Sequence, residues 1–138
     1  MSTARPSILI VDDIPENLAV LSNSLSDQYR VRAATSGARA LSICRSEDPP
    51  AIVLLDVMMP EMDGYEVCRQ LKADPRTAQI PVFFVSGNAG LEEEERCLAL
   101  GGVDCLNKPI RVALLLRRLE QQIELLTARR RIAELTGA

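Results

Sequence analysis

The 138-residue sequence contains no histidine and no tryptophan, and aromatic residues make up only 3% of it. The absence of histidine excludes histidine metal ligands, histidine general bases and histidine phospho-acceptors within this chain. Hydrophobic residues nevertheless account for 47% of the sequence. Aliphatic side chains must therefore supply most of the core.

Long hydrophobic runs and paired cysteine motifs are also absent. No apolar stretch is long enough to span a membrane, and no signal-peptide segment is visible. We therefore expect a soluble, cytoplasmic protein that does not bind membranes. The four cysteines never occur in C-x-x-C spacing, and each lies in an otherwise apolar segment. This pattern favours buried thiols in a reducing compartment over a disulfide or a zinc site.

Five apolar, β-branched runs alternate with helical patterns along the chain. The expected helices begin near Pro15, Gly37, Gly64, Glu92 and Arg111, and the second ends near Glu47. Strict alternation with short connections predicts an α/β domain with a doubly wound parallel sheet and helices on both faces. The expected strands are Ile8–Val11, Arg30–Ala34, Ile52–Leu55, Val82–Ser86 and Val103–Leu106.

The last expected helix, from Arg111 to about Leu135, is roughly twice as long as such a domain requires. An apolar seam repeats in it at steps of three and four, and a displaced seam follows, as in a coiled coil with a stutter. We expect a domain over residues 6–125 and a helical, coiled-coil-like linker over residues 126–138 that leads toward an output domain. The pattern favours a parallel homodimer. The first seam comprises Val112, Leu116, Leu119, Ile123 and Leu126, and the second comprises Leu125, Ala128, Ile132 and Leu135.

Arginines make this last segment basic, whereas the rest of the chain is acidic. A basic tail is compatible with nucleic-acid binding. The arginines alternate with leucines in a helical pattern, so a solvent-facing helix surface is the better explanation. We expect no direct DNA binding.

Reactive side chains stand at the ends of four expected strands. Asp12 and Asp13 follow the first, Asp56 the third and Lys108 the fifth, and Ser86 ends the fourth. The carboxyl ends of parallel strands share one sheet edge, where open α/β sheets bind ligands. Aspartate can accept a phosphoryl group, and Mg²⁺ prefers carboxylate oxygens and water. The set predicts a Mg²⁺-dependent phosphoryl-transfer site with Asp56 as nucleophile.

The charges at this edge are consistent with a bound cation. Three clustered carboxylates would raise one another's pKa, whereas Mg²⁺ and Lys108 together would neutralise them. Phosphorylation of Asp56 would add about one negative charge. That charge can draw Lys108 and the hydroxyl of Ser86 inward, and we interpret this movement as a switch.

Each residue also has a simpler explanation. The acid pair after the first strand could cap the helix that begins at Pro15, a lone Asp56 could be a turn residue, and Ser86 opens an ordinary turn sequence. An aspartyl-phosphate phosphatase would need a second acid where Met58 stands, and a nucleotide-binding domain would need a glycine-rich loop after the first strand. The joint placement at four strand ends favours the phosphoryl-transfer site.

The sequence resembles the receiver domain of two-component response regulators over about residues 6 to 125. The resemblance implies a CheY-like, flavodoxin-like (βα)5 fold with strand order 2-1-3-4-5. It implies a phosphorylated signalling switch, fed by a partner histidine kinase or histidine phosphotransfer protein, rather than an enzyme with its own product. The matching stretches are Ile8-Leu9-Ile10-Val11-Asp12-Asp13, Leu54-Leu55-Asp56-Val57-Met58-Met59-Pro60-Glu61-Met62-Asp63-Gly64, Pro81-Val82-Phe83-Phe84-Val85-Ser86 and Lys108-Pro109.

The resemblance also implies a role for each site residue. Asp13, Asp56 and the backbone carbonyl of Met58 would ligate Mg²⁺, and Asp12 would act mainly through water. Ser86 and Lys108 would hold the phosphoryl group on Asp56, and Lys108-Pro109 would be a cis peptide. Phosphorylation would then alter the face formed by the fourth helix, the fifth strand and the last helix.

One position departs from the family pattern. The fifth strand usually carries Tyr or Phe three positions before the lysine, as a ring that turns inward when the hydroxyl residue moves, and here that position is Cys105. The usual aromatic relay cannot operate, so the signal would travel through the fourth strand and the fourth and last helices. A degenerate receiver that acts only in protein interaction or dimerisation, and a redox role for Cys105, stay open as alternatives.

The output is suggested by similarity alone. The run Asp13-Ile14-Pro15-Glu16-Asn17-Leu18 and the arginine-rich last helix resemble those of receivers fused to cyclic-di-GMP enzymes or found in hybrid kinases. We expect an output domain of one of these kinds as the downstream partner.

Overall fold

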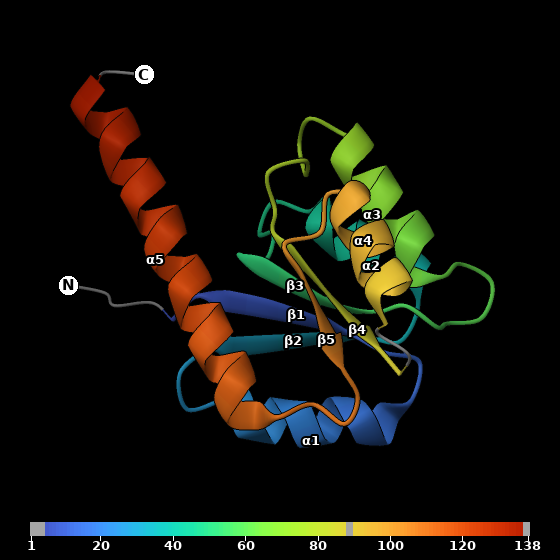
Figure 1. The fold of residues 1–138 in the computed structure, drawn as a ribbon. Helices are drawn as coiled ribbons and strands as arrows, with labels where there is room; N and C mark the ends of the chain where they lie inside the picture. Colours follow the sequence, from blue (N-terminus) through green and yellow to red (C-terminus); the bar gives the residue numbers. More distant parts are fainter. Residues whose placement is uncertain (1–4, 88–89, 137–138) are drawn as a thin grey trace.

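The computed structural model describes residues 5–87 and 90–136, in which strands and helices alternate strictly (Figure 1). The prediction of an α/β domain is confirmed. In chain order the elements are β1 (Ser7–Val11), α1 (Pro15–Leu25), β2 (Arg30–Ala34), α2 (Gly37–Cys44), β3 (Ile52–Asp56), α3 (Gly64–Ala73), β4 (Val82–Ser86), α4 (Leu91–Ala99), β5 (Asp104–Asn107) and α5 (Val112–Thr136).

The five strands form one parallel sheet in the order β2-β1-β3-β4-β5, which confirms the predicted flavodoxin-like topology. Every residue of β1, β3 and β4 is buried. Strands covered on both faces have no solvent side, so their sequences are apolar throughout instead of alternating. The exceptions are the polar residues at strand ends, which lie at the sheet edges.

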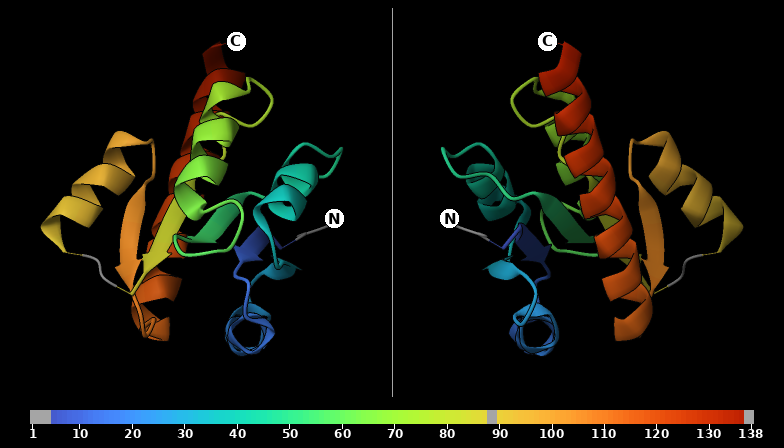
Figure 2. Two further views of the ribbon diagram at one scale, coloured as in Figure 1. Left: turned by 90° about the vertical axis from the view of Figure 1, so that its right-hand side faces the viewer. Right: turned by 90° about the vertical axis from the view of Figure 1, so that its left-hand side faces the viewer.

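Helices cover both faces of the sheet and bury separate aliphatic cores (Figure 2). On one face α2, α3 and α4 pack on strand residues such as Leu9 and Val53. On the other face α1 and α5 pack on the alternate residues, such as Ile8 and Ile52. The doubly wound arrangement therefore follows from the period-two alternation of side chains along buried strands.

Some element boundaries differ slightly from those expected. Helix α2 ends at Cys44 instead of near Glu47, because the chain turns at Ser46, whose hydroxyl donates to the carbonyl of Ile43 at 2.6 Å. Strand β5 begins one residue later than expected, after Val103. These shifts leave every expected element in place.

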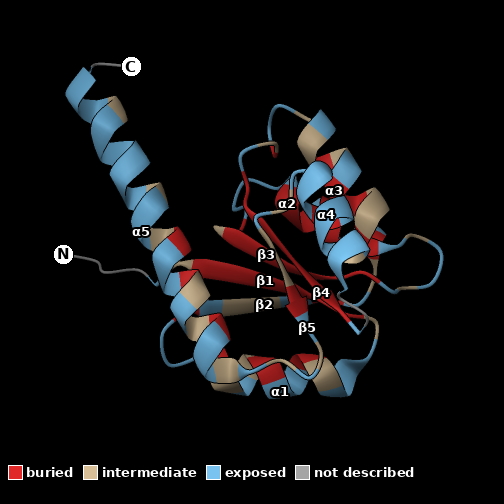
Figure 3. Ribbon diagram, viewed as in Figure 1, coloured by how far each residue is buried: buried red, intermediate tan, exposed pale blue. Residues whose placement is uncertain are grey.

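Helix α5 covers the sheet with its first half, and its second half extends beyond the sheet (Figures 1 and 3). The buried residues of α5 are Leu115, Leu119 and Gln122. Of the expected first seam, Leu119 is buried and Leu116, Ile123 and Leu126 are partly buried and pack on the core, whereas Leu115, which the expected seam omitted, is the most buried with Leu119. This face of the helix packs against the sheet and α1. Beyond Gln122 no described residue is buried, and Ile132 is 60% exposed. The last two residues of the expected linker, 137 and 138, lie outside the described part of the chain.

No helix within residues 5–87 and 90–136 is both long and apolar enough to cross a membrane.

Gly64 allows α3 to begin directly against the end of β3. A Cβ atom at this position would lie 2.3 Å from the backbone oxygen of Asp56, so no other residue fits without a backbone shift. The adjacent Asp63 caps the helix, accepting from the N–H of Glu66 at 2.9 Å. Gly64 and Asp63 thus fix the loop that follows the expected nucleophile.

Candidate phosphoryl-transfer and metal site

Asp12 and Asp13 follow β1 at the carboxyl edge of the sheet. Asp12 is buried, and its Oδ1 accepts from the N–H of Ile14 at 2.9 Å while its Oδ2 accepts from the side-chain amide of Asn17 at 3.1 Å. These bonds order the turn before α1, but they are not the helix cap considered above, since the N-cap residue is Ile14 and α1 has no side-chain cap hydrogen bond. Asp13 is partly exposed. The two acids therefore differ, because Asp12 is buried and accepts local hydrogen bonds whereas Asp13 is partly exposed.

Asp56 ends β3 and is nearly inaccessible, with 4% of its surface exposed. Its Oδ1 accepts from the N–H of Met58 at 3.3 Å, and its Oδ2 accepts from Nζ of Lys108 at 3.2 Å. Burial raises the pKa of Asp56, and the hydrogen bond and charge of Lys108 oppose that rise. Lys108 is therefore the main group that stabilises the ionised form of Asp56, against the larger effect of burial.

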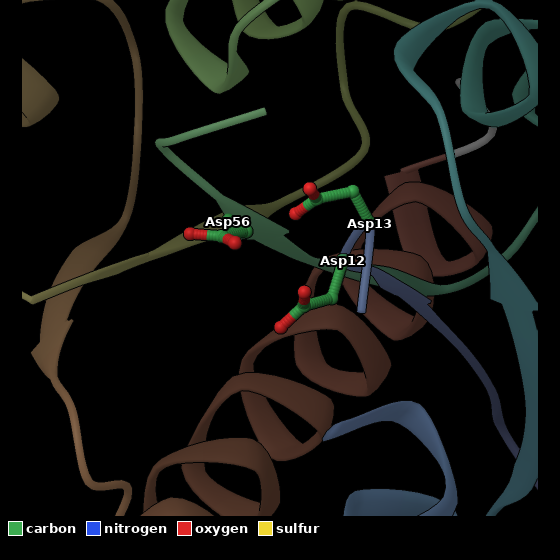
Figure 4. Close-up of side chains that lie close together, drawn as sticks. All are labelled: Asp12, Asp13 and Asp56. Carbon is green, nitrogen blue, oxygen red and sulfur yellow. The ribbon is translucent and has the colours of Figure 1, made fainter. Parts of the chain in front are cut away.

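The three carboxylates converge on one space, as Figure 4 shows. One oxygen from each of Asp12, Asp13 and Asp56 lies within 4.8 Å of the others. Oxygens on opposite sides of a Mg²⁺ ion lie roughly 4 Å apart, since each Mg–O bond is about 2.1 Å. Small side-chain rotations would let the cluster hold such an ion, with waters completing its shell. The donor set therefore fits a hard divalent cation.

Lys108 provides the positive charge in the site. Its Nζ also lies 3.8 Å from Oδ2 of Asp12, so it bridges the acids after β1 and β3. The residue is fixed by its backbone N–H, which donates to the carbonyl of Ser86 at 2.9 Å, and the Lys108-Pro109 peptide bond is cis. The loop after β5 is thereby tied to the end of β4.

Ser86 ends β4 and is buried, one residue beyond Val85, the partner of Asp56 across the strands. Its hydroxyl donates to Oε1 of Glu93 on α4 at 3.1 Å. Glu93 belongs to a run of four acids, Glu92 to Glu95, at the start of α4. Of those four, Glu93 alone is partly buried, a difference that no sequence signal indicated.

A cavity of about 480 Å³ opens from the acid cluster along the face of α1. Asp12, Asp56 and Lys108 lie among its lining, together with apolar residues that include Val20, Leu21 and Ile110. The nearly buried carboxylate of Asp56 therefore lines a cavity.

Residues 8–120 match the family described as the response regulator receiver domain. The chain belongs to this family. The receiver is 45% identical over 118 residues to a probable cyclic di-GMP phosphodiesterase of Vibrio cholerae, covering 86% of this chain and 26% of that protein. It is 44% identical over 112 residues to the response regulator PleD of Caulobacter vibrioides, covering 80% of this chain and 24% of PleD.

Solved receiver structures share the fold. The receiver domain of a sensor histidine kinase from Pseudomonas aeruginosa PAO1, which has a magnesium ion coordinated in its active-site cleft, aligns with a TM-score of 0.78 and 32% identity. The alignment covers 88% of this chain and 99% of that one. By contrast, this chain spans only about a quarter of the length of the first curated relatives it matches.

In this receiver Cys105 lies beside another thiol. Its Sγ is 3.3 Å from Sγ of Cys97 on α4, and both cysteines are free. Burial raises the pKa of Cys97, and burial together with the neighbouring thiol raises the pKa of Cys105 to about 12. Both thiols are therefore protonated at neutral pH, which does not favour a reactive redox cysteine.

An aromatic ring packs near this thiol pair from another element. Tyr65, in the first turn of α3, has its ring centroid 5.6 Å from that of Phe84, and the guanidinium of Arg96 lies 4.0 Å above its ring. Burial, and then the carboxylate of Glu93, raise the pKa of Tyr65 well above its ordinary value. No signal in the sequence indicated Tyr65, because the pattern of an amphipathic helix does not distinguish such a tyrosine from any other core residue.

Proposed function

We propose that this receiver accepts a phosphoryl group on Asp56 from a phosphohistidine of a partner histidine kinase or phosphotransfer protein. The observation that carries the proposal is the position of Asp56: a nearly buried carboxylate, 3.2 Å from Nζ of Lys108, with two further aspartates close by. A carboxylate oxygen attacks the phosphorus, the P–N bond to the partner's imidazole breaks, and an acyl phosphate forms. The product is a modified receiver and a neutral histidine on the partner.

Positive charge in the site can offset the repulsion between the two anions that react. Two anions, Asp56 and the incoming phosphoryl group, must approach each other, and Lys108 lies where it can contact both. A Mg²⁺ ion held by Asp13, Asp56 and the backbone carbonyl of Met58, with Asp12 acting through water, would supply the remaining positive charge. Ser86 would donate its hydroxyl to the phosphoryl group, and the α4–β5–α5 face would respond.

Covalent modification of Asp56 is the direct test. Acetyl phosphate with Mg²⁺ should add one phosphoryl group by intact-mass spectrometry, and beryllofluoride should give a stoichiometric adduct. Asp56→Asn removes the attacking carboxylate and should abolish both. Asp27→Asn, which changes an exposed acid outside the site, should leave both unchanged. Folded wild type that gains neither adduct nor Mg²⁺ affinity would overturn the proposal.

The second candidate is a degenerate receiver that acts only in protein interaction. The observation in its favour is Cys105, which stands where receivers usually carry an aromatic ring. The same experiment separates the two, because a degenerate receiver forms no acyl phosphate.

We further propose that residues 6–125 form the receiver and residues 126–138 a linker to an output domain. The relatives support this division, since one is named a probable cyclic di-GMP phosphodiesterase and this chain matches only about a quarter of its length. The exposed Leu125, Ile132 and Leu135 support pairing of two chains through α5. Sedimentation velocity with and without beryllofluoride tests the dimer, and a monomer in both states contradicts it.

A further inference from the structure

Glu93 differs in burial from the three other acids at the start of α4. Glu92, Glu94 and Glu95 are exposed, whereas Glu93 is partly buried and faces the sheet. Its Oε1 accepts the hydroxyl of Ser86 at 3.1 Å. A carboxylate on α4 is therefore joined to the residue that ends β4.

The contact between Ser86 and Glu93 bears on phosphorylation because it uses the hydroxyl proton of Ser86. A serine hydroxyl has a single proton to donate. In the proposed function Ser86 gives it to a phosphoryl oxygen, but in this structure it gives it to Glu93. Two anions cannot both receive one proton, so Glu93 and the phosphoryl group compete for Ser86. Their like charges add repulsion to this competition.

A replacement donor for Glu93 is already nearby. The hydroxyl of Tyr65 is buried and has no hydrogen-bond partner among the described residues. It lies close enough to Glu93 for the carboxylate to influence its ionisation, yet the two groups do not meet hydrogen-bond geometry. Buried hydroxyls are normally paired. A small rotation of Glu93 away from Ser86 would satisfy the Tyr65 hydroxyl.

We infer that Glu93 is a positioning residue that holds the Ser86 hydroxyl in the unphosphorylated receiver and exchanges it for the hydroxyl of Tyr65 when Asp56 is phosphorylated. The exchange links the phosphorylation site to α3 and α4 without an aromatic ring at Cys105. This inference rests on the proposed function, because the phosphoryl group on Asp56 is the competing acceptor.

Beryllofluoride affinity in the presence of Mg²⁺, measured by NMR titration, tests the competition. Glu93→Ala removes the acceptor and should bind on the order of tenfold more tightly, the effect of one hydrogen bond to a charged group. Glu93→Gln keeps an acceptor oxygen without the charge and should lie between. Glu92→Ala, an exposed neighbour, should match wild type. Unchanged or weaker binding by Glu93→Ala would overturn the inference.

A spectroscopic signature distinguishes positioning from general loosening. In the ligand-free Glu93→Ala protein, the Ser86 amide resonance should move along the line that joins its free and adduct positions in wild type. Tyr65→Phe removes the replacement donor and should weaken adduct binding several-fold, whereas a shift off that line or an unchanged affinity would contradict the exchange. If wild type forms no adduct, the proposed function itself fails; if wild type forms it and Glu93→Ala is identical, only this inference fails.

Discussion

The sheet edge around Asp56 is buried and hydrogen-bonded, whereas the second half of α5 is mostly exposed to solvent. At the edge, Asp12, Asp56 and Ser86 are buried, and hydrogen bonds from four different segments hold their polar atoms. Beyond Gln122, by contrast, α5 has no buried residue among those described, and Leu135 is 81% exposed. The side chains of the site are thus held by contacts within the domain, whereas Ile132 and Leu135 near the end of α5 are largely exposed.

The largest expected effect is a loss of stability when a buried leucine of α5 is shortened, compared with an exposed leucine farther along the same helix. Leu115 is fully buried and Leu125 is 44% exposed, on the same helix. Leu115→Ala should lower the free energy of unfolding by about 2–5 kcal/mol, because it removes buried methyl groups and leaves a cavity. Leu125→Ala should change it by less than about 0.5 kcal/mol. Urea denaturation of both variants checks the contrast, and equal losses would mean that the second half of α5 packs on the domain.

A smaller effect is expected when the edge loses its only lysine. Lys108→Ala removes the cation 3.2 Å from Asp56, so beryllofluoride should bind about 10- to 100-fold more weakly, corresponding to about 1.5–3 kcal/mol for a charged hydrogen bond. Arg39→Ala, at an exposed position on α2, is the matched control. Wild-type affinity in Lys108→Ala would show that this lysine does not contact the bound group.

The smallest expected effect is a pH dependence of stability. Burial raises the pKa of Asp56 in the folded protein above its model-peptide value of 3.8. Between 3.8 and that raised pKa the folded state binds more protons than the unfolded state, so stability falls as pH rises through this window. The side-chain amide of the Asp56→Asn variant does not ionise, so the stability of this variant should not fall in that pH window.

Urea denaturation without metal, repeated across the acid pH range, measures this difference. The free energy of unfolding of Asp56→Asn should exceed that of wild type by an amount that grows as pH rises and then levels off. Added Mg²⁺ should reduce this advantage, because the ion binds wild type preferentially. An advantage that is independent of pH would contradict the origin assigned to the pKa shift.

Much of the fold and the acid cluster could be predicted from the sequence, for a physical reason that can be stated residue by residue. Strand runs such as Ile52–Asp56 are apolar because both sheet faces are covered, and this leaves a strong signal for the three central strands β1, β3 and β4. Parallel strands place their ends at one edge, so Asp12, Asp13 and Asp56 had to converge. The inward residue of α5 could not be predicted as reliably, since Val112, Leu115 and Leu116 are all apolar and packing alone selects Leu115.

The amino-acid sequence by itself determined the order of strands and helices, the acids at the strand ends and the lysine that faces them, because each depends on local hydrophobic pattern and chain direction. Only the tertiary structure decided that Glu93 accepts the proton of Ser86 and that Tyr65 lies beside it. Those contacts join α3, β4 and α4, which come together in the core on one face of the sheet. No pattern within a single segment specifies which of four successive glutamates turns inward.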